Sequence, residues 1–551
     1  MGTENNTTIE VIKFHNGVPL LPDAEKTKKE IFTILGPEDK SMSKDEKIAA
    51  VCKIISNRLR KFGNFGLLKK GAEKTNADFG FSLKTGEAYT INKENALLAA
   101  FIYENFGISS ASSTYKYVIQ AWKHACFMGQ ELLTAIFAHY DTERGVLHFP
   151  NDNRQTIVCE KDGIKLVPNG SSGVRINLHL FAAFVYLGQN VGTEPVIEKF
   201  LFHNLNCSEE QNQFLNAKEA AFILEIFFYM IPFANAMETR PLLVIHGQKG
   251  SGKSSLLKLM GKALFGPEWN LSLIPRSRRD LETEFANNIL CCFDNVDRKI
   301  QKSQRDAFAA ITTGCGYRSR QLYTDSTQKS YNPRPLIAIT TRDPAFSAED
   351  DDILDRALII RLKSLTDVIP ENELVAAVIK NRDEILTEMV NKMPKLIAAL
   401  KDDATIDNNR SFRMADFSTF AYKAAFPIFR GRLNDTEVAE LLNKVFEKLI
   451  ASQKAYVLTS PLHYAIDLFV QNAKVFPVTK QTRELYTELL KIDKKFSLGF
   501  KKICKSLIAF GKLMSTNESI FADRYGYSKK RGTGNKMQHT FNGMKKDDLE
   551  I

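Results

Sequence analysis

Cysteine is scarce in this sequence and poorly placed for cross-links or metal sites. The 551 residues include eight cysteines, at positions 52, 126, 159, 207, 291, 292, 315 and 504. No two of them have the C-x-x-C spacing, and none has a histidine at zinc-finger spacing. The sequence therefore indicates neither a disulfide framework nor a structural metal site, and reduced thiols in a cytoplasmic protein fit best.

Signals for secretion or membrane insertion are also missing. The first ten residues, MGTENNTTIE, lack the basic and then apolar order of a signal peptide. One apolar run, 220–237, has a marginal length for a membrane span, and it contains Glu225 and Pro232. Because a carboxylate at the centre of a bilayer is costly, we expect a buried core helix here and no membrane partner.

Repeats and low-complexity segments are absent too, which leaves a globular chain. Its length allows about three or four domains, and 44% hydrophobic residues can fill real cores. The net charge of +11 is unevenly distributed, since residues 491–551 hold 14 Lys and Arg against 6 Asp and Glu. We therefore expect any binding of a polyanion near the C-terminal end.

A phosphate-loop motif is the strongest signal that the sequence does contain. Residues 247–254 read GQKGSGKS and match G-x-x-x-x-G-K-[ST] at every fixed position. The apolar run 242–245 precedes the motif like a buried strand, and apolar residues at helical spacing follow it from Leu256 to Leu264. Glycines let backbone N–H groups turn toward phosphate oxygens, and the helix offers its positive end. The sequence thus predicts a site for ATP.

The predicted cofactors are ATP and Mg²⁺. Lys253 would reach the β- and γ-phosphates, and the Ser254 hydroxyl would be a ligand of Mg²⁺. The predicted nucleotide-binding residues are Gly247, Gln248, Lys249, Gly250, Ser251, Gly252, Lys253, Ser254 and Ser255.

A second buried strand, 289–293, ends immediately before a candidate magnesium carboxylate. We expect Asp294 to hold Mg²⁺ through water. Asn295 stands where a second acid is usual, and an amide can orient water but cannot accept its proton. Asp297 is a candidate for that role, although an Asp that caps the following helix explains it equally well.

The pattern between the second and third buried strands indicates an inserted hairpin. Arg318, Arg320 and Lys329 would give the hairpin cations that hold a DNA backbone. Ordinary surface charge is the alternative. The third strand ends at Thr341, where a polar side chain can sense hydrolysis of the γ-phosphate.

Two arginines further along the chain are candidates for contact with a nucleotide. Arg356 precedes a fourth strand and can project into the nucleotide of a neighbouring copy, or else pair with Asp355 or Asp352. Arg413 begins a helix of a lid and can report the state of the γ-phosphate, with Arg410 as a nearby rival.

These motifs together resemble a known family. The run from 241 to 417, with GQKGSGKSS, CCFDNVD, RSRQLYTD, LDRALIIRL and SFRMADF, resembles superfamily-3-like AAA+ ATPases and helicases carried by phages and integrative mobile elements. The resemblance implies a hexameric or similar ring that uses ATP and Mg²⁺ to unwind or translocate DNA during replication of a mobile element. It also implies a primase or other replication protein as a partner.

The family's functional residues carry over to five positions. Lys253 and Ser254 match the phosphate loop, and Asp294 matches the Walker B acid. Thr341 matches the first sensor and Arg356 the arginine that acts in trans. Asn295 and Thr341 depart from the usual second acid and Asn sensor, which puts helicase activity in more doubt than ATPase activity.

The expected fold class is α/β, built around an AAA+ P-loop core with a parallel sheet flanked by helices. The expected parts are an N-terminal α+β accessory domain (1–175), a helical collar (176–240), the ATPase core (241–365), a helical lid (366–430) and a basic C-terminal domain (431–551). The last part has predicted helices at 479–490 and 497–514, a strand at 519–521 and a glycine turn. This order is typical of a winged helix that binds DNA through Lys501, Lys502 and Lys505, although a structural bundle has the same periodicity.

The function predicted from these features is an ATP-dependent DNA helicase or translocase in the replication of a phage or mobile element. The alternative is a nucleotide-gated initiator or helicase loader that hydrolyses ATP slowly, which Asn295 favours. A small-molecule kinase would have no use for the basic C-terminal region or for Arg356.

Overall fold

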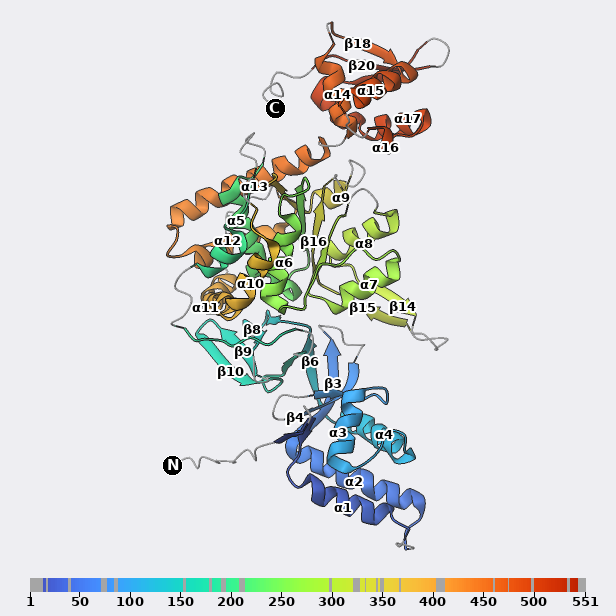
Figure 1. Ribbon diagram of the computed structural model, residues 1–551, viewed down its shortest axis with the longest axis vertical. Helices are drawn as coiled ribbons and strands as arrows, with labels where there is room; N and C mark the ends of the chain where they lie inside the picture. Colours follow the sequence, from blue (N-terminus) through green and yellow to red (C-terminus); the bar gives the residue numbers. More distant parts are fainter. Residues whose placement is uncertain are drawn as a thin grey trace. The chain divides into compact units, whose positions relative to one another are not determined.

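The computed structural model divides the chain into two compact units (Figure 1). One unit comprises Met1–Val191, Gly316–Asn332 and Met393–Ala398, and the other Gly192–Cys315, Pro333–Lys392 and Ala399–Ile551. The structure describes residues 13–15, 18–37, 41–70, 77–83, 88–151, 155–177, 181–189, 195–207, 214–296, 300–320, 328–331, 333–342, 345–346, 351–365, 368–402, 412–458, 461–473, 475–496, 500–532 and 536–543.

The first unit begins with four helices around a mixed five-stranded sheet of order β11-β6-β3-β4-β5. Its elements are β1 (Lys13–His15), β2 (Val18–Leu20), α1 (Ala24–Leu35), α2 (Lys44–Phe62), β3 (Gly63–Lys70), β4 (Ala77–Leu83), β5 (Ala88–Thr90), α3 (Ala96–Phe106), α4 (Ser113–Phe127), β6 (Gln130–Ala135) and β11 (Val174–Ile176). Phe81, Phe101 and Trp122 are fully buried at the centre of its core. The mixture of helices and strands agrees with the α+β character expected for this region.

A four-stranded antiparallel meander follows in the same unit. It consists of β7 (His139–Asp141), β8 (Val146–Pro150), β9 (Gln155–Glu160) and β10 (Gly163–Pro168). The helical collar expected at 176–240 is wrong over 181–189, which have no helical structure. The rings of Phe181 and Phe184 in this stretch instead pack on Phe137 (5.1 Å) and Phe149 (5.8 Å). The apolar residues at helical spacing therefore belong to a segment without helical structure, and their rings pack on aromatic side chains of other segments.

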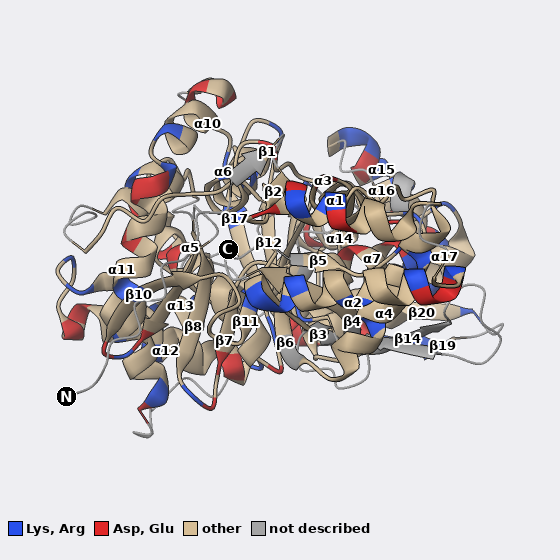
Figure 2. Ribbon diagram, turned by 90° about the horizontal axis from the view of Figure 1, so that it is seen from below, with Lys and Arg blue, Asp and Glu red and all other residues tan. Residues whose placement is uncertain are grey.

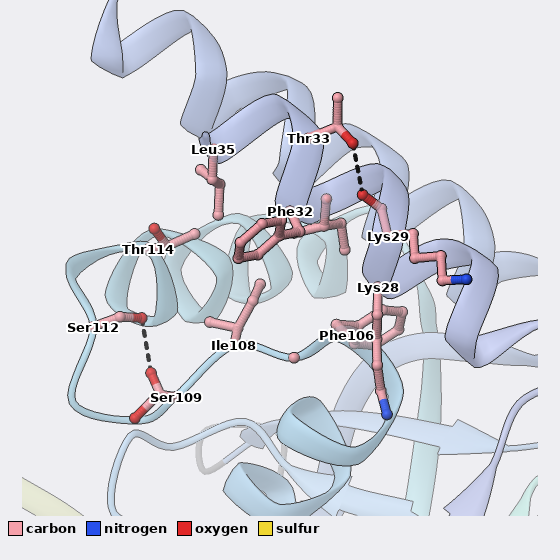
Figure 3. Close-up of a pocket in the computed structure, with 12 residues that line it drawn as sticks. Lys28, Lys29, Phe32, Thr33, Leu35, Phe106, Ile108, Ser109, Ser112 and Thr114 are labelled. Atoms are coloured by element: carbon pink, nitrogen blue, oxygen red, sulfur yellow. Dashed lines mark hydrogen bonds between the residues drawn. The ribbon is translucent and has the colours of Figure 1, made fainter. Parts of the chain in front are cut away.

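A cavity of about 710 Å³ lies between α1 and the loop that joins α3 to α4. Both lysines and glutamates lie along α1, as the blue and red segments of Figure 2 show. Figure 3 shows Phe32 of this helix pointing toward Ile108 and Lys28 beside Phe106, and Phe32 is 82% exposed. The residues that line this cavity come from positions 28–114, so it includes none of the predicted nucleotide-binding residues.

The second unit contains the apolar run that the sequence singles out. The π-helix η1 (Glu198–Phe202) precedes α5 (Ala217–Met230), which continues into the 3₁₀ helix η2 (Ile231–Ala236). Among the described residues, Ala217–Ala236 is long and apolar enough to cross a membrane, but 83% of that stretch is buried inside the protein. Glu225 accepts hydrogen bonds from both terminal nitrogens of Arg432. The run is a core helix, as predicted.

A four-stranded parallel sheet of order β13-β16-β12-β17 forms the centre of this unit. Its strands are β12 (Leu242–Gly247), β13 (Leu290–Phe293), β16 (Leu336–Thr341) and β17 (Ala357–Leu362). All four lie where the apolar runs predicted them. Beyond β13, Ser272 makes a parallel bridge to Phe293. Because the strands are parallel, their carboxyl ends share one edge of the sheet.

Helices connect these strands, and one hairpin, whose residues belong to the first unit, lies between α8 and β16 in the sequence. They are α6 (Lys253–Phe265), α7 (Arg278–Asn287), α8 (Lys302–Thr312), the hairpin of β14 (Tyr317–Arg320) and β15 (Gln328–Tyr331), and α9 (Asp351–Leu354). β14 and β15 pair antiparallel, which confirms the predicted hairpin.

Four helices follow the sheet. They are α10 (Glu371–Lys380), α11 (Arg382–Lys401), α12 (Ala415–Phe429) and α13 (Asp435–Leu458). Gln453 in α13 donates a hydrogen bond to the Ala357 carbonyl of β17 (3.0 Å). α13 thus packs with the sheet, although the sequence analysis grouped it with the C-terminal domain.

The C-terminal part has a core of its own, which runs from Leu462 to Phe541. Its elements are α14 (Pro461–Gln471), β18 (Val478–Gln481), α15 (Thr482–Phe496), α16 (Phe500–Ile503), α17 (Leu507–Thr516), α18 (Glu518–Tyr525), β19 (Ser528–Arg531) and β20 (Met537–Phe541). The strands form an antiparallel sheet of order β18-β20-β19. The expected helix 497–514 is in fact two helices, because Ser506 caps a new helix at Leu507. The expected strand 519–521 is wrong, since it lies within α18.

Candidate active site

The phosphate loop connects the buried central strand β12 to α6, as its motif requires. Gly250 and Gly252 have φ angles of 79° and 77°, in the left-handed region that favours glycine. A Cβ atom on Gly247 would lie 2.5 Å from Ser251 Oγ and 2.6 Å from the Leu362 carbonyl oxygen. Glycine at 247 therefore lets the loop close tightly against the end of β17.

Two polar side chains of the loop lie inside this turn. Lys253 is only 8% exposed, and its Nζ donates to the Gln248 carbonyl (3.1 Å). Ser251 is buried as well, and its Oγ has no hydrogen-bond partner within the described part of the chain. A buried ammonium and an unsatisfied hydroxyl in a glycine turn fit a site that receives phosphate oxygens.

The predicted magnesium ligands meet at the carboxyl edge of the sheet. Ser254 Oγ, at the start of α6, donates to Asp294 Oδ1 over 2.6 Å. Asp294 follows β13 directly, and its backbone N–H donates to the Ser272 carbonyl (2.9 Å). A hydroxyl and a carboxylate are the hard oxygen ligands that Mg²⁺ prefers, so the residues present fit ATP with Mg²⁺.

Thr340, next to the predicted sensor Thr341, completes the setting of this carboxylate. Its Oγ1 donates to Asp294 Oδ1 (2.5 Å) and accepts from the Asn295 backbone N–H (3.0 Å). Thr340 and Thr341 are both fully buried at the end of β16. Consecutive residues of a strand point to opposite faces, so only one of them can face Asp294 in this way.

Asn295 adopts a left-handed backbone conformation, with φ 54°. Its side-chain amide donates to Asp294 Oδ2 (3.1 Å). Asparagine tolerates this conformation better than most residues do. Asn295 therefore helps to orient the Asp294 carboxylate. Asp297, the candidate base, lies outside the described residues.

Ser255, a predicted nucleotide-binding residue, is engaged by a helix instead. Its hydroxyl donates to Glu371 Oε2 (2.8 Å), and Lys258 Nζ donates to Glu371 Oε1 (2.6 Å). The hydrogen bond from Lys258 lowers the pKa of the Glu371 carboxyl. Glu371 thus ties the start of α10 to α6, a contact between residues 116 positions apart that the sequence analysis missed.

Arg356 and Arg413 lie at the amino ends of the parallel strands, opposite the carboxyl ends where the phosphate loop lies. Leu242 pairs with Ala357, and Gly247 pairs with Leu362, so Arg356 stands beside the amino end of β12. Five residue steps of a strand put this end roughly 17 Å from the phosphate loop. The Leu242 N–H donates to the Arg356 carbonyl (2.9 Å). Arg356 cannot reach the phosphate loop of its own chain.

Arg413 is at this same edge, through a contact with the residue before Arg356. Its Nη1 donates to Asp355 Oδ2 over 2.7 Å, and both side chains are about half exposed. The sequence analysis considered Asp355 as a partner of Arg356, whereas its carboxylate binds Arg413. At this end of the sheet, Arg413 lies away from the phosphate loop and therefore from a γ-phosphate bound in its own chain. Arg410 lies outside the described residues.

The predicted DNA-binding residues fall in two separate places. Arg318 and Arg320 are on β14, and Lys329, on β15, pairs with Ser319 between them. Lys501 is exposed on α16, Lys502 follows it, and Lys505 is exposed in the loop that leads to α17. The structure thus places three of these cations on the inserted hairpin and three in the C-terminal part.

A family comparison adds evidence for the middle of the chain. Residues 212–427 match the model of a family described as actinomycete integrative conjugative element replication protein. This match confirms the predicted resemblance to proteins of integrative mobile elements. No match was found among curated proteins.

Several solved structures are similar at low identity. A structure titled "SCCmec type IV Cch - active helicase" has 14% identity and a TM-score of 0.43, and the match covers 88% of this chain and 94% of that one. The apo structure of the NrS-1 C-terminal region has 11% identity and a TM-score of 0.36, with 91% and 100% covered. A JCV helicase structure has 11% identity and a TM-score of 0.20, with 41% and 61% covered. No residue's role passes to this chain from proteins this distant.

Proposed function

We propose that the protein is an ATP-dependent DNA helicase or translocase of the superfamily-3 AAA+ type that acts in replication of a mobile genetic element. The contact of Ser254 with Asp294 beside the buried Lys253 carries the proposal, because it unites the two halves of a nucleotide site. The match of residues 212–427 to a family of replication proteins supports the biological setting.

The residues of the loop and the sheet edge have separate roles in the proposed hydrolysis. Lys253 would hold the β- and γ-phosphates, while Ser254 and Asp294 would hold the metal. Bound Mg²⁺–ATP supplies a phosphoryl group whose charge the metal partly neutralises. Thr340 and Asn295 keep the Asp294 carboxylate in one orientation through the hydrogen bonds described above.

The position of Arg356 supports assembly into a ring. An arginine that stands roughly 17 Å from its own phosphate loop can stabilise transferred phosphate only in another copy. We therefore propose a site shared between neighbours, with the loop from one copy and Arg356 from the next. A closed ring follows when every copy offers both surfaces, and a hexamer is the proposed size.

Two parts of the chain support contact with DNA. The hairpin carries Arg318, Arg320 and Lys329, cations suited to a phosphate backbone. In the C-terminal part, the order α14, β18, α15, α17, β19 and β20 supports the proposal of a winged helix. Lys505 and Lys512 are exposed there, next to Ile508, which is 77% exposed.

The direct test is strand separation on a forked duplex with ATP and Mg²⁺. We expect the wild type to unwind the fork and Lys253→Ala to lose at least about 100-fold in rate, since it removes the only buried cation of the loop motif. Arg278→Ala is the control, because Arg278 is a half-exposed cation of α7 that pairs with Glu282 outside the loop. Equal loss in both variants, or unwinding by Lys253→Ala, would contradict the proposal.

A nucleotide-gated initiator or helicase loader is the second candidate. It is favoured by Asn295, whose amide occupies the position beside Asp294 where a second carboxylate would activate water. Such a protein would bind DNA and self-associate with ATP, yet leave the fork intact. The unwinding assay therefore separates the two functions.

A further inference from the structure

Tyr456, near the end of α13, is buried at the carboxyl edge of the parallel sheet. Its side chain is 1% exposed and contacts two segments that lie at this edge. One is the chain after β16, which Tyr456 meets through its hydroxyl, and the other is the end of β12, which it meets through its ring. The partner of the hydroxyl is 111 positions away in the sequence, so no local motif indicates this contact.

The hydroxyl of Tyr456 holds the chain that follows β16. The Ala345 backbone N–H donates to Tyr456 Oη over 2.9 Å, and this hydrogen bond is buried. Ala345 is itself buried and comes four residues after Thr341, the last residue of β16. Thr340, the residue before Thr341, binds Asp294. The hydrogen bond thus fixes the outgoing chain close to the strand end that supports the proposed metal carboxylate.

The ring of Tyr456 supports the strand that enters the phosphate loop. It lies edge-on to the ring of His246, with the centroids 5.5 Å apart and an interplanar angle of 84°. His246 is buried and immediately precedes Gly247, the first residue of the loop motif. His246 and Thr341 are partners in the parallel register of β12 and β16, so their side chains share one face of the sheet. Tyr456 therefore contacts two neighbouring segments at the point where they leave the sheet.

The helix α13 is fixed to the sheet one turn before Tyr456. Gln453 lies three residues earlier, and so on the same side of the helix, and it donates to the Ala357 carbonyl of β17 (3.0 Å). This hydrogen bond is buried, and breaking it would leave polar groups without a partner inside the protein. Tyr456 is thus held in place while the two segments rest against it.

We infer that Tyr456 is a positioning residue for ATP hydrolysis, and that its hydroxyl and its ring have separate effects. The inference rests on the proposed function, in which ATP and Mg²⁺ bind at the phosphate loop. The N–H groups of the loop meet phosphate oxygens in bound ATP as well as in the transition state, so displacement of the end of β12 should weaken the binding of ATP. The end of β16 holds Asp294 in the orientation that hydrolysis requires, so its displacement should slow the chemical step.

Two substitutions at Tyr456 separate these effects. Tyr456→Phe keeps the ring against His246 and removes only the hydroxyl that binds Ala345. Tyr456→Leu removes both contacts, and Tyr456→Phe carries the test if the leucine variant does not fold. The matched control is Tyr422→Phe, because Tyr422 is another buried tyrosine, whose hydroxyl donates to Asn443 Oδ1 (2.5 Å) and joins α12 to α13.

The experiment measures steady-state ATP turnover of the full chain with Mg²⁺ and a forked DNA, over a range of ATP concentrations. We expect Tyr456→Phe to lower kcat about 10-fold and to keep the KM for ATP within about two-fold of the wild type. Tyr456→Leu should lower kcat as much and also raise KM at least about five-fold. Tyr422→Phe should keep both constants, although it should lower the midpoint of thermal unfolding as Tyr456→Phe does.

Three results would overturn the inference. Tyr456→Phe with the kcat of the wild type would show that the hydroxyl has no effect on hydrolysis. Equal loss of kcat in Tyr456→Phe and Tyr422→Phe would mark a general loss of stability, and an unchanged KM in Tyr456→Leu would remove the role of the ring. Failure of the proposed function is a separate outcome, because the wild type itself would then show no ATP turnover above that of Lys253→Ala.

Discussion

At the scale of single residues, the carboxylate of Asp294 is held by three neighbours from different parts of the chain. Ser254 comes from α6, Thr340 from β16 and Asn295 from the turn after β13. The carboxylate therefore has little freedom to rotate, an arrangement that suits the metal site proposed above. Pre-organised ligands of this kind lower the cost of ordering the site.

The two adjacent threonines of β16 give a sharp test of this arrangement. Thr340→Val keeps the shape of the side chain but removes the hydroxyl bonded to Asp294, so we expect ATP turnover to fall about 10-fold. Thr341→Val is the matched variant, and we expect a change below about three-fold. Steady-state turnover at saturating Mg²⁺–ATP measures both. The opposite ranking would favour Thr341 as the sensor and contradict the assignment made from the structure.

Sequence motifs could predict the part of the site that lies in one continuous stretch. Lys253, Ser254 and Asp294 each follow from a pattern with fixed local spacing. The choice between Thr340 and Thr341 could not be made that way, because it depends on the face of the sheet on which the Asp294 carboxylate lies. The hydrogen bond of Ser255 to Glu371 could not be predicted either, because Glu371 is distant in sequence and belongs to no motif.

At the scale of elements, the buried strands could be predicted from the sequence, but the absence of a helix from a stretch with helical spacing could not. Each strand of the parallel sheet is a continuous apolar run, since helices and loops cover both of its faces. The stretch 181–187 has apolar residues at helical spacing, yet the rings of Phe181 and Phe184 contact aromatic residues of other segments. Such contacts override local preference, and a pattern within one segment does not contain them.

The small C-terminal sheet contains a histidine that should make its stability depend on pH. His539 of β20 lies between Thr482 Oγ1 (2.9 Å from Nε2) and the Tyr527 hydroxyl (2.6 Å from Nδ1). Burial lowers its pKa to about 4 in the folded protein, and the positive charge of Lys529 adds to the effect. In the unfolded chain the pKa is about 6.5. Above that value neither state is protonated, and the stability is complete.

Below pH 6.5, His539 becomes protonated in the unfolded chain but stays neutral in the folded domain. Stability should therefore fall as the pH drops from about 6.5 to about 4, by up to about 3 kcal/mol for this one group. Hydrogen exchange of β20, corrected for the intrinsic rate, measures the change. His539→Gln should reduce the dependence, and His203→Gln, at an exposed histidine, should leave it unchanged. A dependence that survives His539→Gln in full would contradict this account.

At the scale of the whole molecule, the parallel sheet keeps the phosphate loop and Arg356 apart. The register between β12 and β17 fixes this separation, and the surrounding helices do not change it. A site that needs both must draw them from two copies. Mixing two inactive variants tests this directly, because each supplies the half that the other lacks.

We expect Lys253→Ala and Arg356→Ala each to be inactive alone and to regain ATP turnover when mixed. In a mixture of equal parts, about a quarter of the sites would combine an intact loop with an intact arginine. Arg278→Ala mixed with Lys253→Ala is the control for dilution by an active partner. A mixture no more active than its components would show that each copy builds its site alone.

The same geometry has a consequence for dilute protein under the proposed assembly. A single copy would bind ATP without the arginine of a neighbour and would hydrolyse it slowly. Specific activity should then rise with protein concentration and fall on dilution. At low concentration, hydrolysis would wait until several copies assemble.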